Sequence, residues 1–255
     1  MDSTIDKDAL LSEGEEDVTE EELNTPIVLT DRDLGLMTLC HEERYLAYSH
    51  IKEGFWPDRS NESNGARRRI RRLTEEGYLK KEWIDHRSQL LYLLGERGRQ
   101  VLKERNLDQG LDLYRYSEDR DTRLIDHHLM VTNIRLLFRD LGIPGWTSER
   151  ILMEREHRHF YPDGILNLRG DKIAIEYENG LKSKQRYVDR FASYAKSAEY
   201  TLAIFIVAGV VRDWLFELEY RLDQICFVEY KHLFRRKAEA ELENKASKFV
   251  LAEIL

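Results

Sequence analysis

Three acidic residues in the segment FYPDGILNLRGDKIAIEYENG, residues 160–180, have the types and spacing of a metal site. Asp163 precedes one short apolar run, and Glu176 and Glu178 end the next. Residues i and i+2 of a strand share a face, so the two glutamates would lie side by side and need a positive partner. Carboxylate oxygens are the ligands that Mg²⁺ and Mn²⁺ prefer, and such an ion activates water and stabilises charge that develops on a phosphate. We therefore predict that Asp163, Glu176 and Glu178 are catalytic and bind Mg²⁺ or Mn²⁺.

Two lysines shortly after these acids extend the prediction. Lys182 and Lys184 follow Gly180, and an ammonium group there would neutralise charge on a phosphate or assist proton transfer. We assign this catalytic role to Lys182. The alternative is a solvated strand end, whose acids pair with nearby arginines and lysines and bind no metal. The sequence leaves both interpretations open.

A second candidate metal site lies just upstream, in REHRHFY. His157 and His159 alternate along a strand-like segment, and Tyr161 stands two residues further on. Such a set resembles the metal-binding pair and nucleophile of tyrosine relaxases, but Arg158 stands where that family has a large apolar residue. The preferred interpretation is therefore exposed strand histidines near DNA. The histidine pair 127–128 lies in a predicted helix and receives no functional role.

A cluster of the opposite charge occurs in SNESNGARRRIRRLTEEGYLKK, residues 60–81. Ala66, Ile70 and Leu73 are spaced as one apolar face of a helix, and Gly77 is typical of the residue just past a helix end. Five arginines surround that face and are predicted to contact DNA: Arg67, Arg68, Arg69, Arg71 and Arg72. DNA phosphates neutralise such a cluster, and arginine also binds guanine edges in the major groove. The alternative is a solvated basic face that pairs with the glutamates at 62, 75 and 76.

The elements around this helix have the order of a winged helix-turn-helix. Two predicted helices precede it, the first capped by Thr30 or Asp31, and the alternating segments YLKKEWI and QLLYLLG follow as strands joined by DHRS. A further helix, ERGRQVLKERN, closes the unit. The arginine-rich helix would take the recognition position, and DHRS, with Arg87, would be a wing tip that contacts DNA. We therefore predict a winged-helix DNA-binding domain at residues 27–106 and a linker at 107–119.

The rest of the sequence predicts a mixed sheet with flanking helices, at residues 120–233. A first helix is closed by Gly142, and strands follow in TSERILMER, DGILNLR and KIAIEYE, the last two joined by a tight turn at Gly170 and Asp171. A helix in KSKQRYVDRFASYAKSAEY, a buried strand in TLAIFIVAG, a helix in VVRDWLFELEYRLD and a strand in ICFVEY come next. A basic helix is expected to finish the chain at 234–255. The predicted fold class is α+β, with the winged helix first and an α/β domain second.

The composition is that of a globular protein with a real core, since 42% of the residues are apolar and 35% are charged. No apolar run is long enough to span a bilayer. The acidic start resembles neither a signal peptide nor a transit peptide, so we expect a cytoplasmic location. Cys40 and Cys226 both lie among apolar residues, which favours buried free thiols over a disulfide or a zinc site.

The net charge of −8 is unevenly distributed along the chain. Residues 1–26 contain ten acids and one lysine, a formal charge of −9, which leaves +1 for the other 229 residues. So much like charge with so few apolar residues predicts a disordered acidic tail. Such a tail would compete with a polyanion for a basic surface. The alternative is a segment that only aids solubility.

Both halves together resemble the replication-relaxation family of plasmid and mobile-element proteins. The winged-helix half carries the resemblance in LTDRDLGLMTLCHEERYLAYSHI, ARRRIRRLTEEGYLKK and LLYLLGERGRQVL, and the nuclease-like half in YPDGILNL, KIAIEYENG and RYVDRFASY. The second half is similar in element order to the PD-(D/E)XK nuclease core. The combination also looks like the MobC-type plasmid relaxases, and it covers about residues 29–230.

This resemblance implies metal-dependent nicking of DNA at a plasmid origin, in mobilisation, conjugation or replication. It implies double-stranded DNA as the partner, together with other plasmid-transfer or replication proteins, and it carries the acidic positions over to Asp163, Glu176 and Glu178. One departure matters, because the nuclease pattern has lysine where this chain has Glu178. Some proteins of this fold that lack the lysine are inert and only bind DNA, so a non-catalytic replication or transcription regulator is the alternative. A homodimer is a further alternative that nothing in the sequence demands.

Overall fold

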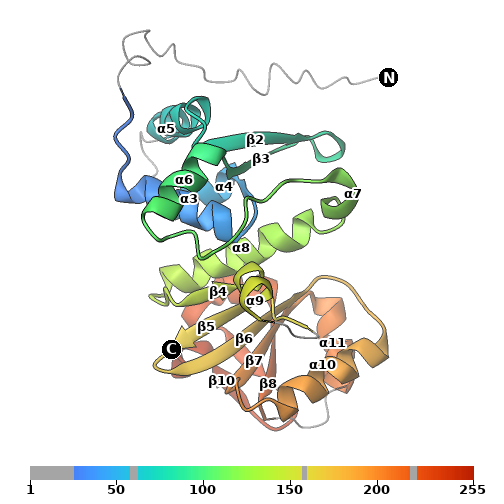
Figure 1. Ribbon diagram of the computed structural model, residues 1–255. Helices are drawn as coiled ribbons and strands as arrows, with labels where there is room; N and C mark the ends of the chain where they lie inside the picture. Colours follow the sequence, from blue (N-terminus) through green and yellow to red (C-terminus); the bar gives the residue numbers. More distant parts are fainter. Residues whose placement is uncertain (1–25, 58–62, 157–159, 219–222) are drawn as a thin grey trace.

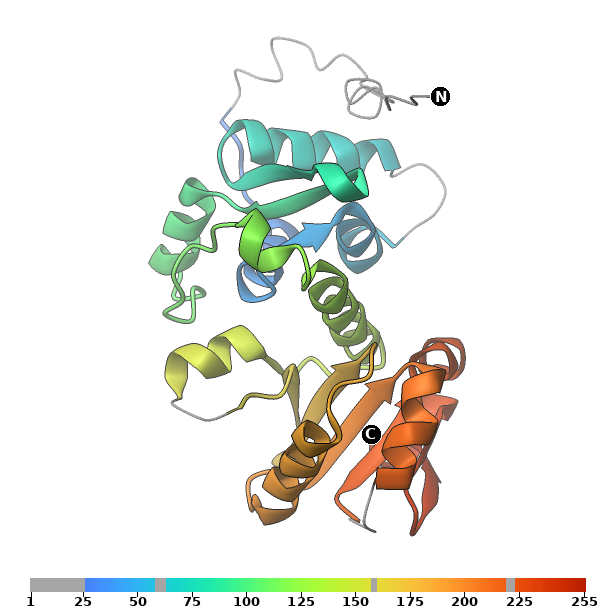
Figure 2. The same ribbon diagram turned by 90° about the vertical axis from the view of Figure 1, so that its right-hand side faces the viewer.

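The computed structural model describes residues 26–57, 63–156, 160–218 and 223–255 (Figures 1 and 2). Within these residues it has a mixed α+β fold with one small and one large β-sheet. The small sheet belongs to the first half of the chain and the large sheet to the second. The acidic tail falls almost entirely outside the described residues.

The first half packs its helices on a three-stranded antiparallel sheet. Its elements are α3 (Asp31–Glu42), β1 (Leu46–Ala47), α4 (Tyr48–Phe55), α5 (Ser63–Glu75), β2 (Leu79–Ile84), the 3₁₀ turn η1 (Asp85–Arg87), β3 (Gln89–Leu94), α6 (Glu96–Glu104) and α7 (Glu118–Asp121). The strand order is β1-β3-β2, so the predicted hairpin of β2 and β3 is confirmed. The two-residue strand β1, which the sequence did not predict, pairs with the other edge of β3.

Two local signals of the sequence set helix ends in this half. Thr30 is the N-cap of α3: its backbone N–H donates to the Asp33 carboxylate at 2.7 Å, and the Asp33 N–H donates back to the Thr30 hydroxyl at 3.3 Å. Each of these bonds satisfies an N–H group that has no partner within the helix. Gly77 follows α5 with a φ of +75°, a conformation that glycine adopts without strain.

The second half is built on a seven-stranded mixed sheet. Its elements are α8 (Ile125–Asp140), β4 (Trp146–Ser148), α9 (Glu149–Arg155), β5 (Gly164–Leu168), β6 (Asp171–Glu178), α10 (Lys184–Lys196), β7 (Leu202–Val207), α11 (Gly209–Leu218), β8 (Ile225–Glu229), α12 (Tyr230–Arg236), the 3₁₀ turn η2 (Lys237–Glu239), β9 (Glu241–Glu243), β10 (Lys248–Val250) and the 3₁₀ turn η3 (Leu251–Glu253). The strand order is β10-β9-β8-β7-β6-β5-β4. β6, β7 and β8 are parallel to one another, and the other pairs are antiparallel. The predicted mixed sheet is therefore confirmed.

Different helices cover the two faces of the large sheet. α10 and α11 cover one face, where Phe191 of α10 packs against Phe205 of β7 and Phe227 of β8. α8 and α12 cover the other face, which includes Ile175 of β6 and Ile204 of β7. Because successive residues of a strand alternate between faces, strands buried on both sides must be apolar almost throughout. This explains the sequence of β7 and the apolar middle of β6, residues 173–175.

The segment 147–155 corrects the predicted strand in TSERILMER. β4 ends at Ser148, and the helix α9 begins at the next residue. The Ser148 side chain accepts a hydrogen bond from the backbone N–H of Ile151 at 3.5 Å. Serine is a favoured N-cap because its oxygen satisfies an N–H group at the open end of a helix. That cap outweighs the strand-like pattern of the following apolar residues.

The predicted terminal helix at 234–255 is also wrong. α12 ends at Arg236, and the chain then forms the hairpin of β9 and β10, which extends the sheet beyond β8. Leu242 of β9 and Leu251 are buried in the core on the α8 side of the sheet. The open edge of β8 supplies the pairing that turns this polar segment into strands.

The turn between β5 and β6 lies one residue earlier than predicted. Leu168 pairs with Asp171, so the two turn residues are Arg169 and Gly170. Both have positive φ, 52° and 95°, as a two-residue type I′ hairpin turn requires. Asp171 is therefore the first residue of β6 and not part of the turn.

α8 lies between the two halves in both ribbon views (Figures 1 and 2). Leu136 on this helix belongs to the core of the first half, whereas Ile134 belongs to a core of the second. Arg135, also on α8, donates to the carboxylates of Glu42 and Glu43 of the first half at 2.6 Å each. One helix therefore belongs to both halves and joins them by apolar and ionic contacts.

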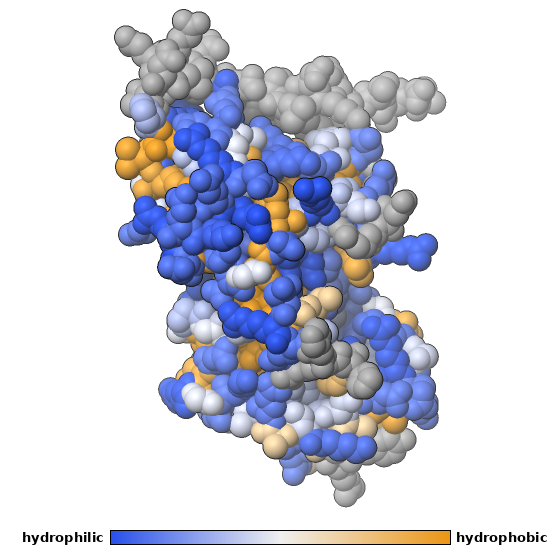
Figure 3. Space-filling model, in the orientation of Figure 1, coloured by the Kyte–Doolittle hydropathy of each residue, from blue (hydrophilic) through white to orange (hydrophobic). Residues whose placement is uncertain are grey.

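The face seen in Figure 3 is mainly hydrophilic and is interrupted by separate apolar areas. Five large apolar side chains are exposed over the described surface: Val28, Leu124, Met153, Leu181 and Val210. Cys40 and Cys226 are buried free thiols, as predicted. Among the described helices, none combines the length and the apolar character needed to cross a lipid bilayer.

Candidate functional site

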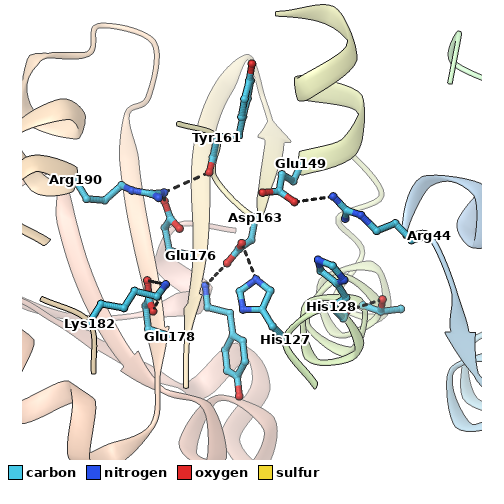
Figure 4. Close-up of polar contacts among 12 residues, drawn as sticks. Arg44, His127, His128, Glu149, Tyr161, Asp163, Glu176, Glu178, Lys182 and Arg190 are labelled. Atoms are coloured by element: carbon cyan, nitrogen blue, oxygen red, sulfur yellow. Dashed lines mark hydrogen bonds and ion pairs between the residues drawn. The ribbon is translucent and has the colours of Figure 1, made fainter. Parts of the chain in front are cut away.

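The predicted acidic site lies where β5 and β6 run side by side, near α8 (Figure 4). Gly164 pairs with Ile175, so Asp163, just before β5, lies beside Glu176. The residue after Asp163 must be glycine, because a Cβ at position 164 would lie 2.0 Å from the ring of Trp146 on β4. The close approach of β4 thus fixes the backbone that carries Asp163. We call Asp163, Glu176 and Glu178 the carboxylate cluster.

Asp163 is held by two partners on different elements. Its Oδ1 lies 2.9 Å from His127 Nε2 on α8, and its Oδ2 accepts a hydrogen bond from the Tyr177 N–H at 2.7 Å. Burial alone would raise the pKa of Asp163, but His127 and the Tyr177 N–H outweigh it and hold this pKa below its usual value. For His127, burial lowers the pKa, but Asp163 outweighs burial and the pKa of the imidazole is raised. The two groups therefore form a stable ion pair.

Glu176 is buried, with 3% of the residue exposed, and its partners come from α10. Its Oε1 accepts short hydrogen bonds from the Arg190 guanidinium and from the Tyr194 hydroxyl. Burial raises the pKa of Glu176 to about 7, the Arg190 charge opposes this rise, and the charges of Asp163 and Glu178 add to it. With this pKa, both the protonated and the ionised form of the carboxyl are populated near neutral pH.

Glu178 also has a cationic and a hydroxyl partner, and both come from the residues that follow it in the chain. Lys182 Nζ lies 2.7 Å from Glu178 Oε1 and 2.6 Å from Oε2, and the Tyr187 hydroxyl donates to Oε2 at 3.2 Å. Glu178 is 5% exposed, so it also is buried. The predicted proximity of Lys182 to the acids is therefore seen, but the lysine is engaged in an ion pair with one of them.

As they lie, the three acids are not arranged as ligands of one ion. Figure 4 shows them turned toward different partners, with Asp163 toward His127, Glu176 toward Arg190 and Glu178 toward Lys182. Within the described residues, no group of three His, Cys, Asp or Glu side chains is placed to hold a metal ion. In this arrangement the donor set does not fit Mg²⁺ or Mn²⁺, because each carboxylate already has a cationic partner in the protein.

The acids pair with cations, as the solvated-strand alternative expected, but Glu176 and Glu178 are buried, and the Asp163 side chain is only 11% exposed. Lys182 was predicted beside the acids, but their partners on α10 were not. Tyr187, Arg190 and Tyr194 are spaced three and four apart on α10, so they lie along one face of that helix. The sequence of α10 did contain a signal for these partners. Polar groups on an otherwise apolar helix face become buried, and buried polar groups need hydrogen-bond partners.

The histidine prediction can be followed only in part. His157 and His159 lie outside the described residues. The Tyr161 hydroxyl donates to the backbone carbonyl of Glu156 at 2.5 Å. Of the pair on α8, His128 forms a buried hydrogen bond with the first half of the chain: its Nδ1 lies 2.8 Å from the Tyr45 hydroxyl. Its neighbour His127 contacts Asp163 of the carboxylate cluster. It is therefore a functional candidate that was not predicted from the sequence.

The arginine-rich helix α5 is a separate candidate site at the far end of the first half (Figure 1). Arg69 serves the fold, since it donates to the Asp33 carboxylate at 2.5 and 2.9 Å and to the Val28 carbonyl at 2.7 Å. The Asp33 side chain is 1% exposed, so this ion pair ties α5 to the start of α3.

The other four arginines of α5 are not part of this ion pair, and we call them the arginine face: Arg67 and Arg68, which are exposed, and Arg71 and Arg72, which are partly exposed. Arg71 pairs with Glu75 at 2.8 Å and Arg72 with Glu76 at 3.5 Å, both at i, i+4 on the surface. Arg67 lies over the Tyr48 ring at 5.7 Å. Arg68 is exposed and forms no ion pair with any residue that the structure describes.

Arg87, predicted at the wing tip, lies in η1 between β2 and β3. Its guanidinium forms an ion pair with Asp126 in the first turn of α8. The tip of the hairpin is therefore held against the helix that joins the two halves, and Arg87 is engaged within the protein.

The sequence pattern of the replication-relaxation family matches residues 37–203, from α3 to β7, which is about two thirds of the chain. Neither the curated proteins nor the solved structures that were compared contain a match. The matched region includes both α5 and the carboxylate cluster. On this match, the chain belongs to the replication-relaxation family.

Proposed function

We propose that the protein binds double-stranded DNA through α5 and acts in the replication or mobilisation of a plasmid or mobile element. The observation that carries the proposal is the exposed arginine face on one helix, next to a β-hairpin. Two helices before α5 and the hairpin of β2 and β3 after it support a winged-helix arrangement, with α5 as the recognition helix.

The charges of the arginine face are available to phosphates at little cost. Exposed i, i+4 ion pairs such as Arg71–Glu75 contribute only about 0.3–0.5 kcal/mol. A charge-assisted contact to a phosphate is stronger and releases counterions from DNA, so it competes well with such pairs. Arg68 is exposed, and it has no ion pair with a described residue that a phosphate would have to replace.

The large sheet is best explained as a nuclease-like core that does not cleave DNA. The antiparallel pair of β5 and β6, followed through α10 by the parallel strand β7, supports a PD-(D/E)XK-like arrangement. The same core supplies His127, Arg190 and Lys182 as internal counter-charges to the carboxylate cluster. A buried ion network closed in this way stabilises one arrangement of strands and α10, which suits a structural role.

Metal-dependent nicking is the second candidate function. It is favoured by Asp163 lying beside Glu176, with Lys182 next to Glu178, as the nuclease resemblance implies. With Mg²⁺ or Mn²⁺ as the cofactor, those four residues would be the catalytic set. The two functions share the DNA-binding half and differ only in what the carboxylate cluster does.

Two assays on the full chain test the proposal. In the first, fluorescence anisotropy measures binding to a labelled duplex from the origin of the element that encodes the protein, with EDTA and with Mg²⁺. We expect equal affinity in both buffers and a loss of about tenfold for Arg68→Ala at low salt, since one phosphate contact contributes on the order of 1 kcal/mol. Lys196→Ala, at an exposed position on α10, is the matched control and should bind as the wild type does. Equal affinity of Arg68→Ala and wild type would reject α5 as the DNA-binding element.

The second assay incubates supercoiled plasmid that carries the same origin with Mg²⁺ or Mn²⁺. We expect no relaxation above the level seen with EDTA. Nicking that depends on the metal and disappears in Asp163→Asn and Glu176→Gln would replace the first candidate by the second.

A further inference from the structure

The described part of the chain begins directly against the helix that we propose binds DNA. Ile27 and Leu29 pack on the core of the first half, and Arg69 of α5 donates to the Val28 carbonyl between them at 2.7 Å. Residues 1–25, which precede this contact, contain ten acids and a single lysine. A strongly acidic segment is thus joined to the chain beside its most basic helix.

We propose that segment 1–25 binds the arginine face of α5 when DNA is absent, and that duplex DNA displaces it. The inference rests on the proposed DNA-binding function and adds a regulator of that same surface. The segment would act as a competitor that is part of the chain and carries the same sign of charge as DNA.

The lengths of the two partners are compatible. The last three acids, Glu20, Glu21 and Glu22, lie within eight residues of Val28. Six extended residues span about 20 Å, and a helix of 13 residues, the length of α5, is also about 20 Å long. These three acids can therefore reach any arginine on α5, and the seven acids before them have a longer reach.

The charges are complementary as well. α5 contains five arginines and one glutamate, Glu75, and segment 1–25 carries a formal charge of −9. The Arg71 and Arg72 pairs on the helix surface are weak enough for a tail carboxylate to replace their partners. A tethered ligand has an effective concentration on the order of millimolar, so individually weak contacts are enough to keep the face occupied.

Competition of this kind lowers the affinity for every duplex by the same factor. Binding to non-specific DNA, which is weak to begin with, then falls below a useful level first. A strong site still displaces the segment. The predicted effect disappears at high salt, because exposed charges are screened over distances of about 8 Å at physiological ionic strength and less above it.

The first measurement compares the full chain with a variant in which the ten acids of segment 1–25 are replaced by asparagine and glutamine. We expect the neutralised variant to bind a labelled duplex about tenfold more tightly at about 50 mM salt, with a steeper salt dependence. The two affinities should converge as salt is raised. Equal affinities and equal salt dependence would overturn the inference.

The second measurement separates docking from plain repulsion between the segment and DNA. A fluorescent synthetic peptide of residues 1–25 is added to the neutralised full chain, and its anisotropy is recorded. We expect binding that Arg68→Glu weakens strongly, that Lys196→Glu on α10 leaves unchanged, and that unlabelled duplex reverses.

The two measurements together distinguish docking of the segment from repulsion, and failure of the inference from failure of the proposed DNA-binding function. Tighter DNA binding by the neutralised variant without binding of the peptide shows repulsion only and overturns the inference. Peptide binding that Arg68→Glu does not affect places the contact elsewhere and overturns it too. If the peptide binds the arginine face while no duplex binds either protein, the contact stands and the proposed DNA-binding function fails.

Discussion

The arginine face of α5 and the carboxylate cluster are both dense groups of like charge, but the protein treats them in opposite ways. Around the cluster, each acid has a cation of its own, and two of the three acids are buried: Asp163 has His127, Glu176 has Arg190, and Glu178 has Lys182. On α5, only Arg69 is neutralised by a buried acid, and the other arginines have surface contacts or, for Arg68, no described ion pair.

This difference separates charge that is neutralised within the protein from charge that is left facing solvent. Burial makes an unpaired charge very costly, so the cluster must be neutralised from within in order to fold. Water solvates the arginine face, so its repulsion can be left for an external polyanion to relieve. The comparison suggests that charge density alone, which drew attention to both regions in the sequence, does not identify a ligand site. The location of the counter-charge does.

The largest expected effect is a loss of stability when a cation of the carboxylate cluster is removed. Arg190→Met removes the main cation of Glu176 and leaves a buried carboxylate, so we expect the free energy of unfolding to fall by about 3 kcal/mol at pH 8. Urea denaturation followed by circular dichroism measures this. The double variant Arg190→Met with Glu176→Gln should recover much of the loss, because the unpaired charge is gone. A loss below about 0.5 kcal/mol, the range of ordinary surface substitutions, would mean that the network is not structural.

A pH dependence is the next largest effect. Glu176 has a pKa of about 7 in the folded protein against 4.5 ordinarily, so between these values the folded state binds more protons than the unfolded state. The contribution of Glu176 to stability must therefore fall as the pH rises through this window. His127, with its raised pKa, acts in the same direction, since its stabilisation is complete below pH 6.5 and is lost as the pH rises through its folded pKa.

We expect the free energy of unfolding of the wild type, taken relative to that of Glu176→Gln, to fall by about 2 kcal/mol between pH 5 and pH 8. The two proteins are compared because the buried His41, His50 and His128 have lowered pKa values and oppose this trend equally in both. Denaturation curves of both proteins at several pH values measure the difference, and a constant difference would show that Glu176 is ionised throughout this range and that Arg190 dominates its environment.

The smallest expected effect is a difference in stability between variants of two neighbouring arginines of α5. Arg69→Ala breaks a partly buried ion pair with Asp33, so we expect a loss of about 2 kcal/mol in stability. Arg68→Ala on the next residue should change stability by less than about 0.5 kcal/mol, because the side chain is exposed. Thermal denaturation of the two variants side by side measures the difference. Equal losses would contradict the division of α5 into a structural and a solvent-exposed face.

The elements that the sequence predicted well are those that local chemistry determines. Thr30 caps α3, and Gly77 and Gly142 follow helices with positive φ, as their residue types indicate. The wrong predictions of secondary structure lie mainly where contacts with residues distant in the sequence determine which element forms. The segment that forms β9 and β10 has no strong strand pattern, and it becomes a hairpin because β8 offers an open edge. Ser148 carried a local signal for α9, but the apolar residues after it fit a strand as well.

The same reasoning applies to the candidate site. The acids could be found from the sequence because Glu176 and Glu178 are two residues apart at a strand end. Lys182 could be found as well, because it follows Glu178 by only four residues. His127 and Arg190 could not, because His127 lies 36 residues before Asp163 and Arg190 lies 14 residues after Glu176, and only the packing of α8 and α10 brings them together. The chemistry of the cluster therefore depends on tertiary contacts that no motif records.

One consequence concerns α8, the helix shared by both halves. His127 in its first turns holds Asp163, while Arg135 and Leu136 two turns later hold the first half of the chain. A straight α-helix transmits a push or a rotation over its length, here about 24 Å for 16 residues. A rotation of the first half against the large sheet would therefore have to move α8 as well, and it would strain the hydrogen bond between His127 and Asp163.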